Sequence, residues 1–585
     1  MKSLRLGAHA RALGAALCVL SVTNLGAVGC STRAPGRDPA ACIAGARRCD
    51  GAGVSACSEG GQWRPLATCD ATAGEFCDAD RGECVSPCRA AAENASYVGC
   101  EYWPATVRNG QVATEIDFGV AVANPSAWPA TVTIDRGGEQ IATRTVAPGA
   151  LETIALPWVP ELKGAFRDYP SVLARGGAYR LRSNVPVVAY QFNPLEYRID
   201  RDCENEHRLM LPTDDGQCYS FSNDASLLLP THALTGNYTV LTWPSTVNRT
   251  RVMAGGDEAY GGTPGFFSVI GAEDHPVTVS VTFSAHVRAS ADGTIGAFAP
   301  GETGEFELGP GDVLQILSDI PSICPEGSRT EPITGGEITY CVMPREYDLS
   351  GTRIAATGRV AVLAGHDCAM VPADAWACDH LEEQLVPMES WGREVAVTVT
   401  RPFGTEPNIV RIVSGRDENS VRFEPPVHDP VTLTIGEVLQ VETRSDVRVV
   451  GSEALLVAQL TVGQSYEGRA SGGPEGAGGD PSLAFVSPVE QYRSEYTFLA
   501  PPTYDVSLVN VVAPEGVDVM LDGAAVPGLH PMGAGRLVSA RVEISGGVHR
   551  MEASQPFGIV VYGFGAYTSY LYPGGLDLQR ITVPF

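Results

Sequence analysis

The sequence predicts an all-β protein, in which tandem antiparallel β-sandwich-like units follow a small disulfide-rich module. Three observations support this prediction. From about residue 101 onward, β-branched and polar residues alternate over short segments, as in residues 431–441. Turn signals such as Asn109–Gly110 separate these segments. The 65 glycines and 42 prolines of the chain favour many turns over long helices.

The N-terminal segment, residues 1–29, has the pattern of a secretory signal peptide. A basic start precedes an apolar run without acidic residues, and small residues precede Cys30. A cysteine at that position is the acceptor for lipidation in bacterial lipoproteins, so we expect a lipid anchor on Cys30 and a tether over residues 30–41. Ordinary signal-peptidase cleavage is the alternative. The chain is therefore predicted to be exported and lipid-anchored to the outer membrane or cell surface, or else secreted.

Residues 42–88 form a cysteine-rich module that contains few apolar residues. So little apolar surface does not stabilise a fold alone, and disulfides are expected to do so. A zinc site is the alternative, but close ligand spacing occurs only at Cys84 and Cys88, and no histidine lies nearby. The six cysteines from Cys42 to Cys84 allow many pairings, so their connectivity stays open.

The later cysteines stand in short loops that favour local pairing. These couples are Cys203 with Cys218, Cys324 with Cys341, and Cys368 with Cys378. The 14 candidate disulfide cysteines are Cys42, Cys49, Cys57, Cys69, Cys77, Cys84, Cys88, Cys100, Cys203, Cys218, Cys324, Cys341, Cys368 and Cys378. Their even number is typical of a fully oxidised extracellular protein.

A weak internal repeat underlies the β region, residues 92–585. Four segments share a glycine, a short alternating strand, a polar turn and a strongly apolar strand, namely residues 176–192, 350–366, 435–460 and 545–564. They recur at about 90 residues or twice that interval, which predicts Ig-sized sandwich units. The expected units lie near 92–200, 201–290, 291–370, 371–465 and 466–585. A propeller-like array of sheets is the alternative.

Charge and motif content exclude several functions. The formal net charge of −27 repels nucleic acid and anionic headgroups, so no nucleic acid is expected, and the lipid anchor is the only expected membrane contact. No segment after the signal reaches the ~18 consecutive apolar residues of a membrane helix. The chain has no G-x-S-x-G elbow and no Gly-Lys pair of a phosphate loop. No cofactor is expected; acidic turns would allow structural calcium, but no spacing supports it.

Three blocks of sequence resemble one known family. They are residues 348–392, with the motifs DLSGT, AVLAGH and CDHLEEQ; AYQFNP at 189–194 followed by SNDASLLLP at 222–230; and PFGIVVYGF near the C-terminus. Together they resemble the N-terminal domain of IgGFc-binding proteins, a β-rich extracellular module that recurs in predicted bacterial, myxobacterial-type surface lipoproteins. The resemblance implies an exterior recognition surface and no catalytic residues. The family-signature residues would be Asn223, Asp224, Asp379, His380, Gln384 and Trp391.

Two polar clusters in these blocks allow a chemical or a structural interpretation. His366-Asp367-Cys368 has the elements of a thiol nucleophile and its base. Neighbours on a strand point to opposite faces, however, and Cys368 is expected to be oxidised. The HLEE run that begins at His380 lacks a second histidine at helical spacing. A polar turn beside the Cys368–Cys378 disulfide is therefore favoured over a metal site.

Two further groups of residues are candidates for ligand contact. Asn223 and Asp224 favour a turn, and buried support of that turn is preferred over contact with a ligand. Tyr567, Tyr570 and Tyr572 alternate along a segment near the C-terminus, where packing in the core is preferred over a recognition face.

These observations predict a non-catalytic cell-surface lipoprotein for binding or adhesion, whose partner is an extracellular protein or glycan. A structural component of an envelope or extracellular matrix assembly is the alternative. A secreted polysaccharide-acting hydrolase is the least favoured class, because it needs paired carboxylates in a cleft and the sequence does not single out such a pair.

Overall fold

The computed structural model describes residues 42–70, 74–93, 96–200, 218–252, 258–325, 328–467, 478–533 and 535–582. Residues 1–29, Cys30 and the expected tether lie outside these ranges. The chain divides into a cysteine-rich unit, residues 42–69 with 76–85, and a main unit that contains the rest of the described chain. Both units are built almost entirely of antiparallel strands, which confirms the predicted all-β class with its N-terminal disulfide-rich region.

The cysteine-rich unit is held by three disulfides around two small sheets. The disulfides join Cys42 to Cys57, Cys49 to Cys77, and Cys69 to Cys84. The strands are β1 (Arg47–Asp50), β2 (Gly53–Cys57), β3 (Trp63–Thr68), β4 (Phe76–Asp78) and β5 (Glu83–Val85). β1, β2 and β3 form one sheet, and β4 pairs with β5. Val54 is the one buried aliphatic side chain among the described residues of this unit, so the cross-links replace a hydrophobic core.

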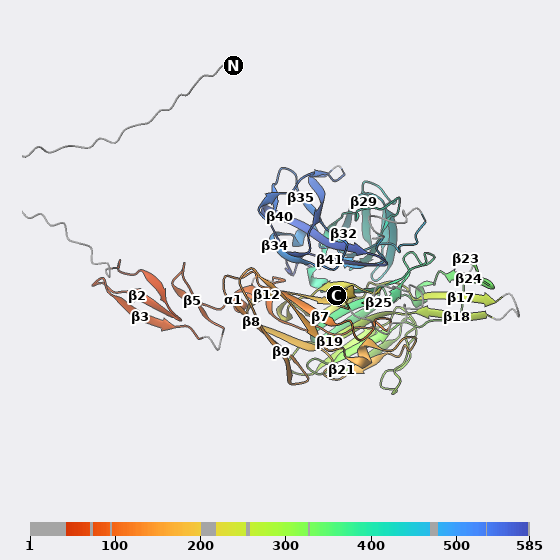
Figure 1. Ribbon diagram of the computed structural model, residues 1–585, viewed down its shortest axis with the longest axis horizontal. Coiled ribbons are helices and arrows are strands. Elements are labelled where there is room, and N and C mark those ends of the chain that lie inside the picture. The colour runs from red at the N-terminus through yellow and green to blue at the C-terminus, as the bar shows by residue number, and fades with distance from the viewer. Residues whose placement is uncertain are drawn as a thin grey trace, which may run out of the picture. The chain divides into compact units, whose positions relative to one another are not determined.

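The main unit contains four repeats of one strand pattern (Figure 1). Repeat 1 consists of α1 (Pro87–Glu93), β6 (Gly99–Tyr102), β7 (Phe118–Ala123), β8 (Ala130–Arg136), β9 (Glu139–Val146), β10 (Leu151–Leu156), α2 (Pro160–Lys163), β12 (Tyr179–Phe192), β13 (Arg198–Ile199), β14 (Cys218–Tyr219) and β15 (Ala225–Leu227). β11 (Val172–Ala174) lies in the same stretch of chain but pairs with β22 in the sheet of repeat 2. Repeat 2 consists of η3 (Thr231–Ala233), β16 (Thr235–Thr239), β17 (Thr246–Val252), β18 (Glu258–Thr263), β19 (Gly265–Gly271), β20 (Val277–Thr282), β21 (Thr303–Leu308), β22 (Val313–Leu317), β23 (Arg329–Ile333), β24 (Gly336–Cys341), η4 (Arg345–Tyr347), β25 (Arg353–Ala369) and β26 (Asp379–Gln384).

The second half of the main unit follows the same order. Repeat 3 consists of η5 (Met388–Ser390), β27 (Gly392–Val397), β28 (Asn408–Ser414), β29 (Asn419–Glu424), β30 (Val431–Leu433), β31 (Val438–Thr443), β32 (Val447–Leu460) and β33 (Leu483–Phe485). Repeat 4 consists of η7 (Val489–Gln491), β34 (Arg493–Ala500), β35 (Val506–Pro514), β36 (Val519–Leu521), β37 (Ala524–Ala525), β38 (His530–Pro531), β39 (Leu537–Ile544), β40 (Gly547–Gly565) and β41 (Thr568–Pro573).

One long strand organises each repeat: β12, β25, β32 or β40. Its first half pairs with the opening strand of the repeat and with a hairpin strand, while its second half pairs with an earlier strand and with the last strand of the repeat. We call the last strands, β15, β26, β33 and β41, the inner strands. The second half of every long strand is buried throughout, because these inner strands cover it. That burial explains why the sequence shows an alternating segment followed by a continuous apolar one.

A tyrosine hydroxyl supports the bend of the long strand in three of the four repeats. Tyr102, Tyr238 and Tyr496 lie on the opening strands, where the pairing register shifts. Each hydroxyl accepts a backbone N–H from three residues earlier and donates to a carbonyl of the long strand, as Tyr238 does to Val360 at 2.8 Å. Repeat 3 has Val395 at the corresponding place. The buried hydroxyl thereby satisfies backbone groups that the register shift leaves unpaired.

The number of units differs from the sequence-based expectation. Strands from residues 201–290 and 291–370 join one sheet around β25, so these two expected units form the single repeat 2. The longer interval before β25 arises because a separate four-stranded sheet is inserted there. We call this sheet the finger sheet; its strand order is β18-β17-β24-β23, and Cys324–Cys341 links it to a neighbouring loop. An insertion, rather than a fifth unit, therefore contributes to the longer spacing.

The inner strands meet at the centre of the main unit. β15 contacts β26 and β41, and β33 contacts the same two strands, so the four inner strands contact one another in cyclic order. In Figure 1, β41 lies between the sheets of repeats 3 and 4 and those of repeats 1 and 2. A curled sheet forms the body of each repeat, and the cyclic contacts between the inner strands are those expected of a closed array.

Candidate binding site at the centre of the four repeats

A single buried carboxylate joins all four inner strands. Asp224, at the start of β15, accepts hydrogen bonds from the backbone N–H groups of Ala225 at 2.9 Å, Glu382 at 3.1 Å, Leu483 at 3.1 Å and Leu571 at 3.4 Å. These donors belong to β15, β26, β33 and β41 in turn. Because the inner strands do not pair with one another backbone to backbone, this side chain supplies the acceptors that a sheet would otherwise provide.

Three side chains of β26 extend this network, which we call the hub. Asp379 accepts the N–H groups of Asn223 at 2.8 Å and Ser569 at 3.2 Å. Glu383 accepts the Ser226 hydroxyl at 2.8 Å, and the Gln384 side-chain oxygen accepts a backbone N–H of the chain that follows β15. All are buried. The predicted polar turn from residue 379 to 384 is therefore wrong: the segment is the strand β26, placed between other inner strands.

Burial shapes the acid–base properties of the hub. Burial raises the pKa of Glu383 well above its usual value, while its bond to Ser226 acts in the opposite direction. One oxygen of Glu383, Oε2, has no hydrogen-bond partner. Burial likewise raises the pKa of Asp224, whereas backbone N–H donors on both of its oxygens favour the charged form. Glu383 therefore has an oxygen that can carry a proton without losing a hydrogen bond, whereas both oxygens of Asp224 already accept hydrogen bonds.

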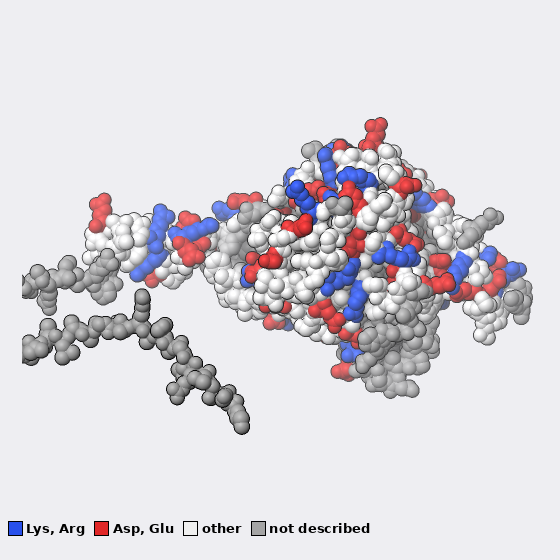
Figure 2. Space-filling view, turned by 90° about the horizontal axis from the view of Figure 1, so that it is seen from above, with Lys and Arg blue, Asp and Glu red and all other residues white. Residues whose placement is uncertain are grey.

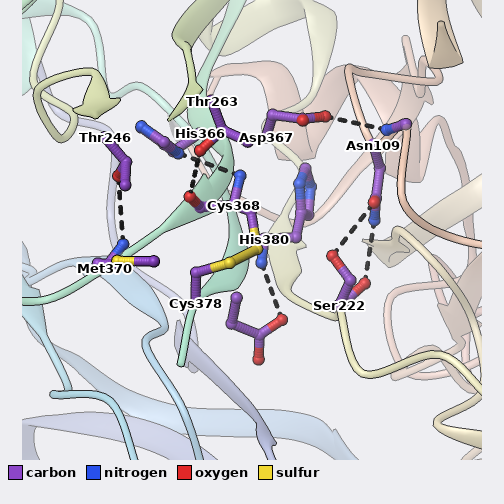
Figure 3. Close-up of a disulfide and its surroundings, with 12 residues drawn as sticks. Asn109, Ser222, Thr246, Thr263, His366, Asp367, Cys368, Met370, Cys378 and His380 are labelled. Carbon is purple, nitrogen blue, oxygen red and sulfur yellow. Dashed lines mark hydrogen bonds between the residues drawn. A yellow bond between two sulfur atoms is a disulfide. The ribbon is translucent and has the colours of Figure 1, made fainter. Parts of the chain in front are cut away.

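The His366-Asp367-Cys368 cluster lies on β25, which pairs with β26 of the hub, and Figure 3 shows it with the Cys368–Cys378 disulfide. Cys368 is bonded to Cys378, so no thiol is present. His366 Nδ1 accepts the backbone N–H of Cys368 at 3.1 Å, and burial lowers the pKa of this histidine to about 3. Asp367 pairs at 2.9 Å with Arg108, and both side chains are buried. Each group of the cluster is therefore engaged in a structural contact.

An aromatic cavity opens where the inner strands begin. Its volume is about 670 Å³, and residues just before each inner strand line it: Phe221 before β15, Cys378 before β26, Asp480 before β33 and Tyr567 before β41. Six aromatic side chains contribute to the lining, namely Phe166, Tyr169, Phe221, Tyr260, Trp376 and Tyr567. A volume of this size falls within the roughly 300–1,000 Å³ range of small-molecule sites.

Trp376 is the most exposed of these aromatic side chains. It lies in the loop closed by the Cys368–Cys378 disulfide, is 39% exposed and meets Tyr567 edge-on, with 6.1 Å between the ring centres. A partly exposed indole in a cavity wall offers apolar ring surface and an N–H group to a ligand. The disulfide restrains the short loop and therefore the position of the indole.

The finger sheet forms another wall of the cavity. β17 and β18 contribute a run of small and uncharged polar residues, among them Asn248, Thr250, Gly261 and Gly262. Thr263 at the end of β18 donates its hydroxyl to the carbonyl of Cys368 at 2.7 Å, as Figure 3 shows. This contact joins the finger sheet to the disulfide loop, so the two walls are held together.

Left-handed backbone conformations concentrate around this cavity. Among the described residues, six other than glycine have positive φ, and four of them line the cavity: Arg167 (φ 59°), Phe221 (46°), Ala377 (79°) and Tyr567 (54°). Each costs on the order of 1–3 kcal/mol and is retained only where the surroundings impose it. Such residues cluster at ligand sites, and their position here supports a binding role for the cavity.

The lining carries two arginines and one carboxylate. Arg288 donates to the carbonyl of Tyr169 at 2.8 Å and pairs with Asp319 at 3.1 Å. Asp480 is buried and accepts a backbone N–H. Arg167 is exposed, and no carboxylate of the described residues lies within ion-pair distance of it. Charges of both signs are interspersed on the face shown in Figure 2, so the excess of acids does not form one continuous patch there.

The sequence-predicted residues are divided between hub, disulfides and core. Asn223, Asp224, Asp379, His380 and Gln384 lie in or beside the hub, whereas Trp391 is buried elsewhere and donates its indole N–H to the carbonyl of Val386 at 3.0 Å. The structure also joins Cys88 to Cys100, Cys324 to Cys341 and Cys368 to Cys378. Cys218 is disulfide-bonded; Cys203 lies outside the described residues.

Sequence reasoning missed most of the cavity. Of the C-terminal tyrosines, Tyr570 and Tyr572 are buried and Tyr567 alone lines the cavity. Trp376 carried a usable signal, because it is the only large aromatic residue between two paired cysteines in a loop of small residues. Phe166 and Tyr260 come from distant segments and carried none.

Neither metal chemistry nor a membrane span is indicated in the described ranges. They contain no group of three or more His, Cys, Asp or Glu residues with the geometry of a metal site. His380 lies 3.5 Å from Glu382, and no further ligand joins the pair. A helix long and apolar enough to cross a bilayer is likewise absent from the part of the chain described above.

Comparison with known proteins identifies the family. The family model for IgGFc binding protein matches residues 224–563, which is more than half of the chain. The human IgGFc-binding protein is 24% identical over 359 residues, covering 59% of this chain and 6% of the human protein, so this chain corresponds to a small part of that relative. A GH78 family rhamnosidase of Bacillus sp. GL1 shares 10% identity at a TM-score of 0.10, over 68% of this chain and 56% of that one, and carries no argument. By its match to the family model, the chain belongs to the IgGFc-binding protein family.

Proposed function

We propose that this protein is an exported, non-catalytic binding protein that holds an extracellular partner, a protein or a glycan, at the aromatic cavity. One observation carries the proposal: an aromatic-lined cavity of about 670 Å³ lies where all four repeats converge. A disulfide restrains one of its walls, and four of its lining residues have a left-handed backbone conformation. Preformed concave sites lined by aromatic groups are typical of specific recognition. The printed name of the human relative refers to binding of an antibody region, and an extracellular protein partner is consistent with it.

A binding role without catalysis is supported by the state of the reactive groups. Cys368 is oxidised, and its neighbour His366 is buried with a lowered pKa. The hub carboxylates Asp224 and Asp379 accept backbone N–H groups and do not line the cavity. Among the described residues, Asp480 is the one carboxylate of the cavity lining, and a catalytic pair would need a second acid, base or nucleophile beside it.

Export and attachment to the cell surface complete the proposal. Six disulfides among the described residues are typical of an oxidising compartment. We assign Cys30 as the lipidation site that anchors the protein for adhesion. Cys30→Ser should release the protein from membranes into the medium, as measured by fractionation and immunoblotting. Retention of the variant on membranes would contradict the lipid anchor.

Arrays of extracellular proteins and glycans, probed with the full-length protein, test the proposed site. Trp376→Ala should weaken binding of the captured partner by at least about tenfold, because exposed tryptophans at recognition sites contribute strongly to affinity. Val548→Ala is the matched control, since Val548 is 38% exposed and lies outside the cavity lining. If a partner binds the wild type, Trp376→Ala and Val548→Ala with equal affinity, the recognition site lies outside the cavity. Turnover of an array glycan would contradict a non-catalytic role.

A further inference from the structure

We infer that the cavity accepts an acidic saccharide, in which aromatic side chains contact the sugar rings and Arg167 pairs with a sugar carboxylate. This inference rests on the proposed function and specifies the ligand class of the same site. Three features of the cavity support this ligand: the aromatic walls, the uncharged polar wall and the unpaired guanidinium of Arg167.

The aromatic walls suit the apolar faces of sugar rings. A pyranose presents axial C–H groups on its faces and hydroxyl groups around its edge, so it packs flat against an aromatic ring. Trp376, Tyr567 and Tyr260 line the cavity and are only partly buried, which leaves ring surface available to a ligand. Trp376 and Tyr567 meet edge-on at an interplanar angle of 77°, so they offer two differently oriented faces. These faces match a ring with two distinct sides.

The wall from the finger sheet suits sugar hydroxyls. Asn248 and Thr250 on β17 provide an amide and a hydroxyl, which donate and accept hydrogen bonds. β18 is the edge strand of the finger sheet, and Gly261 and Gly262 have no side chain that would cover its backbone. A ligand rich in hydroxyl groups needs both neutral donors and neutral acceptors of hydrogen bonds around each sugar ring.

The unpaired guanidinium gives the preference for an acid. Arg167 is exposed and has no ion-pair partner among the described residues, whereas Arg288 is already paired with Asp319. The planar guanidinium matches a carboxylate with two parallel hydrogen bonds. Its guanidinium lies 4.8 Å from the centre of the Phe166 ring, which also lines the cavity, and the arginine stays exposed to solvent. The net charge of −27 disfavours long polyanions, so a short acidic sugar is the better fit.

An acidic peptide is the competing ligand, and the cavity favours the sugar. A peptide would gain affinity by extending a sheet edge and would present its carboxylates on flexible stems. The lining instead offers partly buried rings around a partly open cavity of about 670 Å³, which suits a compact ligand with apolar faces.

Isothermal titration of the full-length protein tests the inference with three probes: tetragalacturonic acid, its carboxyl-reduced neutral counterpart, and tetraaspartate. We expect the uronate to bind at least about tenfold more tightly than either control. Arg167→Gln should remove the preference for the acid and keep the neutral affinity. Trp376→Ala should weaken both saccharides. Arg353→Gln, which changes an exposed arginine of β25 outside the lining, should leave all three affinities unchanged.

The outcomes separate this inference from the proposed function. Equal affinities for the acidic and neutral saccharides, or tetraaspartate binding as tightly as the uronate, would overturn the acidic saccharide. The acidic saccharide is also ruled out if no saccharide binds but Trp376→Ala still abolishes binding of an array partner. In that case the proposed function stands. If no array partner depends on Trp376, the proposed function fails as well. Thermal melts that match the wild type would show that each variant is folded.

Discussion

The hub and the cavity are neighbouring regions at the centre of the four repeats, yet they use polar groups in opposite ways. In the hub, Asp224 accepts hydrogen bonds from all four inner strands and is buried. In the cavity, Arg167 has no carboxylate partner among the described residues, and Trp376 is 39% exposed. A buried group such as Asp224, whose hydrogen bonds are made, stabilises the fold, whereas exposed groups of the cavity lining are available to a ligand.

Backbone conformation shows the same contrast. Four residues of the cavity lining have a positive φ, which is an unfavourable backbone conformation: Arg167, Phe221, Ala377 and Tyr567. The hub lies on regular strands with extended backbone. The protein thus combines regular strands in the hub with less favourable conformations in the neighbouring cavity lining, which is a distribution expected of a recognition site on a rigid framework.

The largest effect should come from Asp224→Asn. An asparagine keeps one acceptor oxygen and replaces the other with an amino group, so two of the four backbone N–H donors lose their acceptor. Each buried donor left without a partner costs about 1–3 kcal/mol, which gives a loss of about 2–6 kcal/mol. Denaturant unfolding followed by fluorescence measures it.

Asp292→Asn is the matched control for Asp224→Asn, because Asp292 lies in an exposed turn and bonds only to nearby residues. Its effect on the free energy of unfolding should be far smaller than that of Asp224→Asn. An Asp224→Asn protein as stable as the wild type would mean that Asp224 is held as a neutral acid, and the hub would then not depend on a charged centre.

Replacement of both Cys368 and Cys378 by serine should have the next largest effect, and it acts on the cavity. The disulfide closes a loop across a sequence separation of 10 residues, and loops of this kind stabilise by about 2–4 kcal/mol. Hydrogen exchange should increase in residues 370–378 and in β18, because Thr263 bonds to the carbonyl of Cys368. Unchanged exchange in β18 would show that the finger sheet holds the wall without the disulfide.

Much of the framework could be predicted from the sequence, because its signals are local. The four repeated segments each contain one long strand, β12, β25, β32 or β40, since alternation and continuous burial leave a visible pattern. The pairings of Cys324 with Cys341 and Cys368 with Cys378 follow from short loops. The insertion of the finger sheet was mistaken for a fifth unit, because strand patterns do not reveal which sheet a strand joins.

The hub and cavity could not be assembled from the sequence for a physical reason. Asp224 bonds to strands that begin at residues 379, 483 and 568, and nothing local marks such distant partners. The HLEE run was expected to be a turn because it is polar, yet its charges are buried as β26 by hydrogen bonds to other repeats. Tertiary contacts thus overrode the local preference.

Glu383→Gln should stabilise the protein and reduce its dependence on pH. Glu383 Oε1 accepts the Ser226 hydroxyl while Oε2 has no partner, so glutamine can keep the bond and place its amino group at the empty side. The raised pKa means that the contribution of Glu383 is complete below the unfolded pKa of about 4.3 and is lost as pH rises toward the folded pKa. At pH 7 to 8 we expect a gain of about 1 kcal/mol.

Melting temperatures of the wild type and Glu383→Gln between pH 4 and 8 check this sign. The two proteins should converge at pH 4 and diverge as pH rises. The lowered pKa of His366 has the opposite effect, since its contribution is present above the unfolded value and is lost as pH falls. Comparison of the two proteins at each pH removes the effect of His366, which both share. Parallel curves would mean that Glu383 is not the titrating group.

The smallest effect should come from Arg167→Gly, and it bears most directly on the cavity. Glycine adopts φ of 59° without steric cost but has a larger conformational entropy to lose, so we expect a net gain of about 0.5 kcal/mol in the free energy of unfolding. Arg353→Gly, in the strand β25, should instead lose about 1 kcal/mol. Denaturant unfolding of both variants measures the difference. If Arg167→Gly is as destabilising as Arg353→Gly, the left-handed backbone carries no cost at this position. A gain combined with loss of uronate binding would mean that the protein retains a less stable backbone at residue 167 because the arginine is needed to bind the ligand.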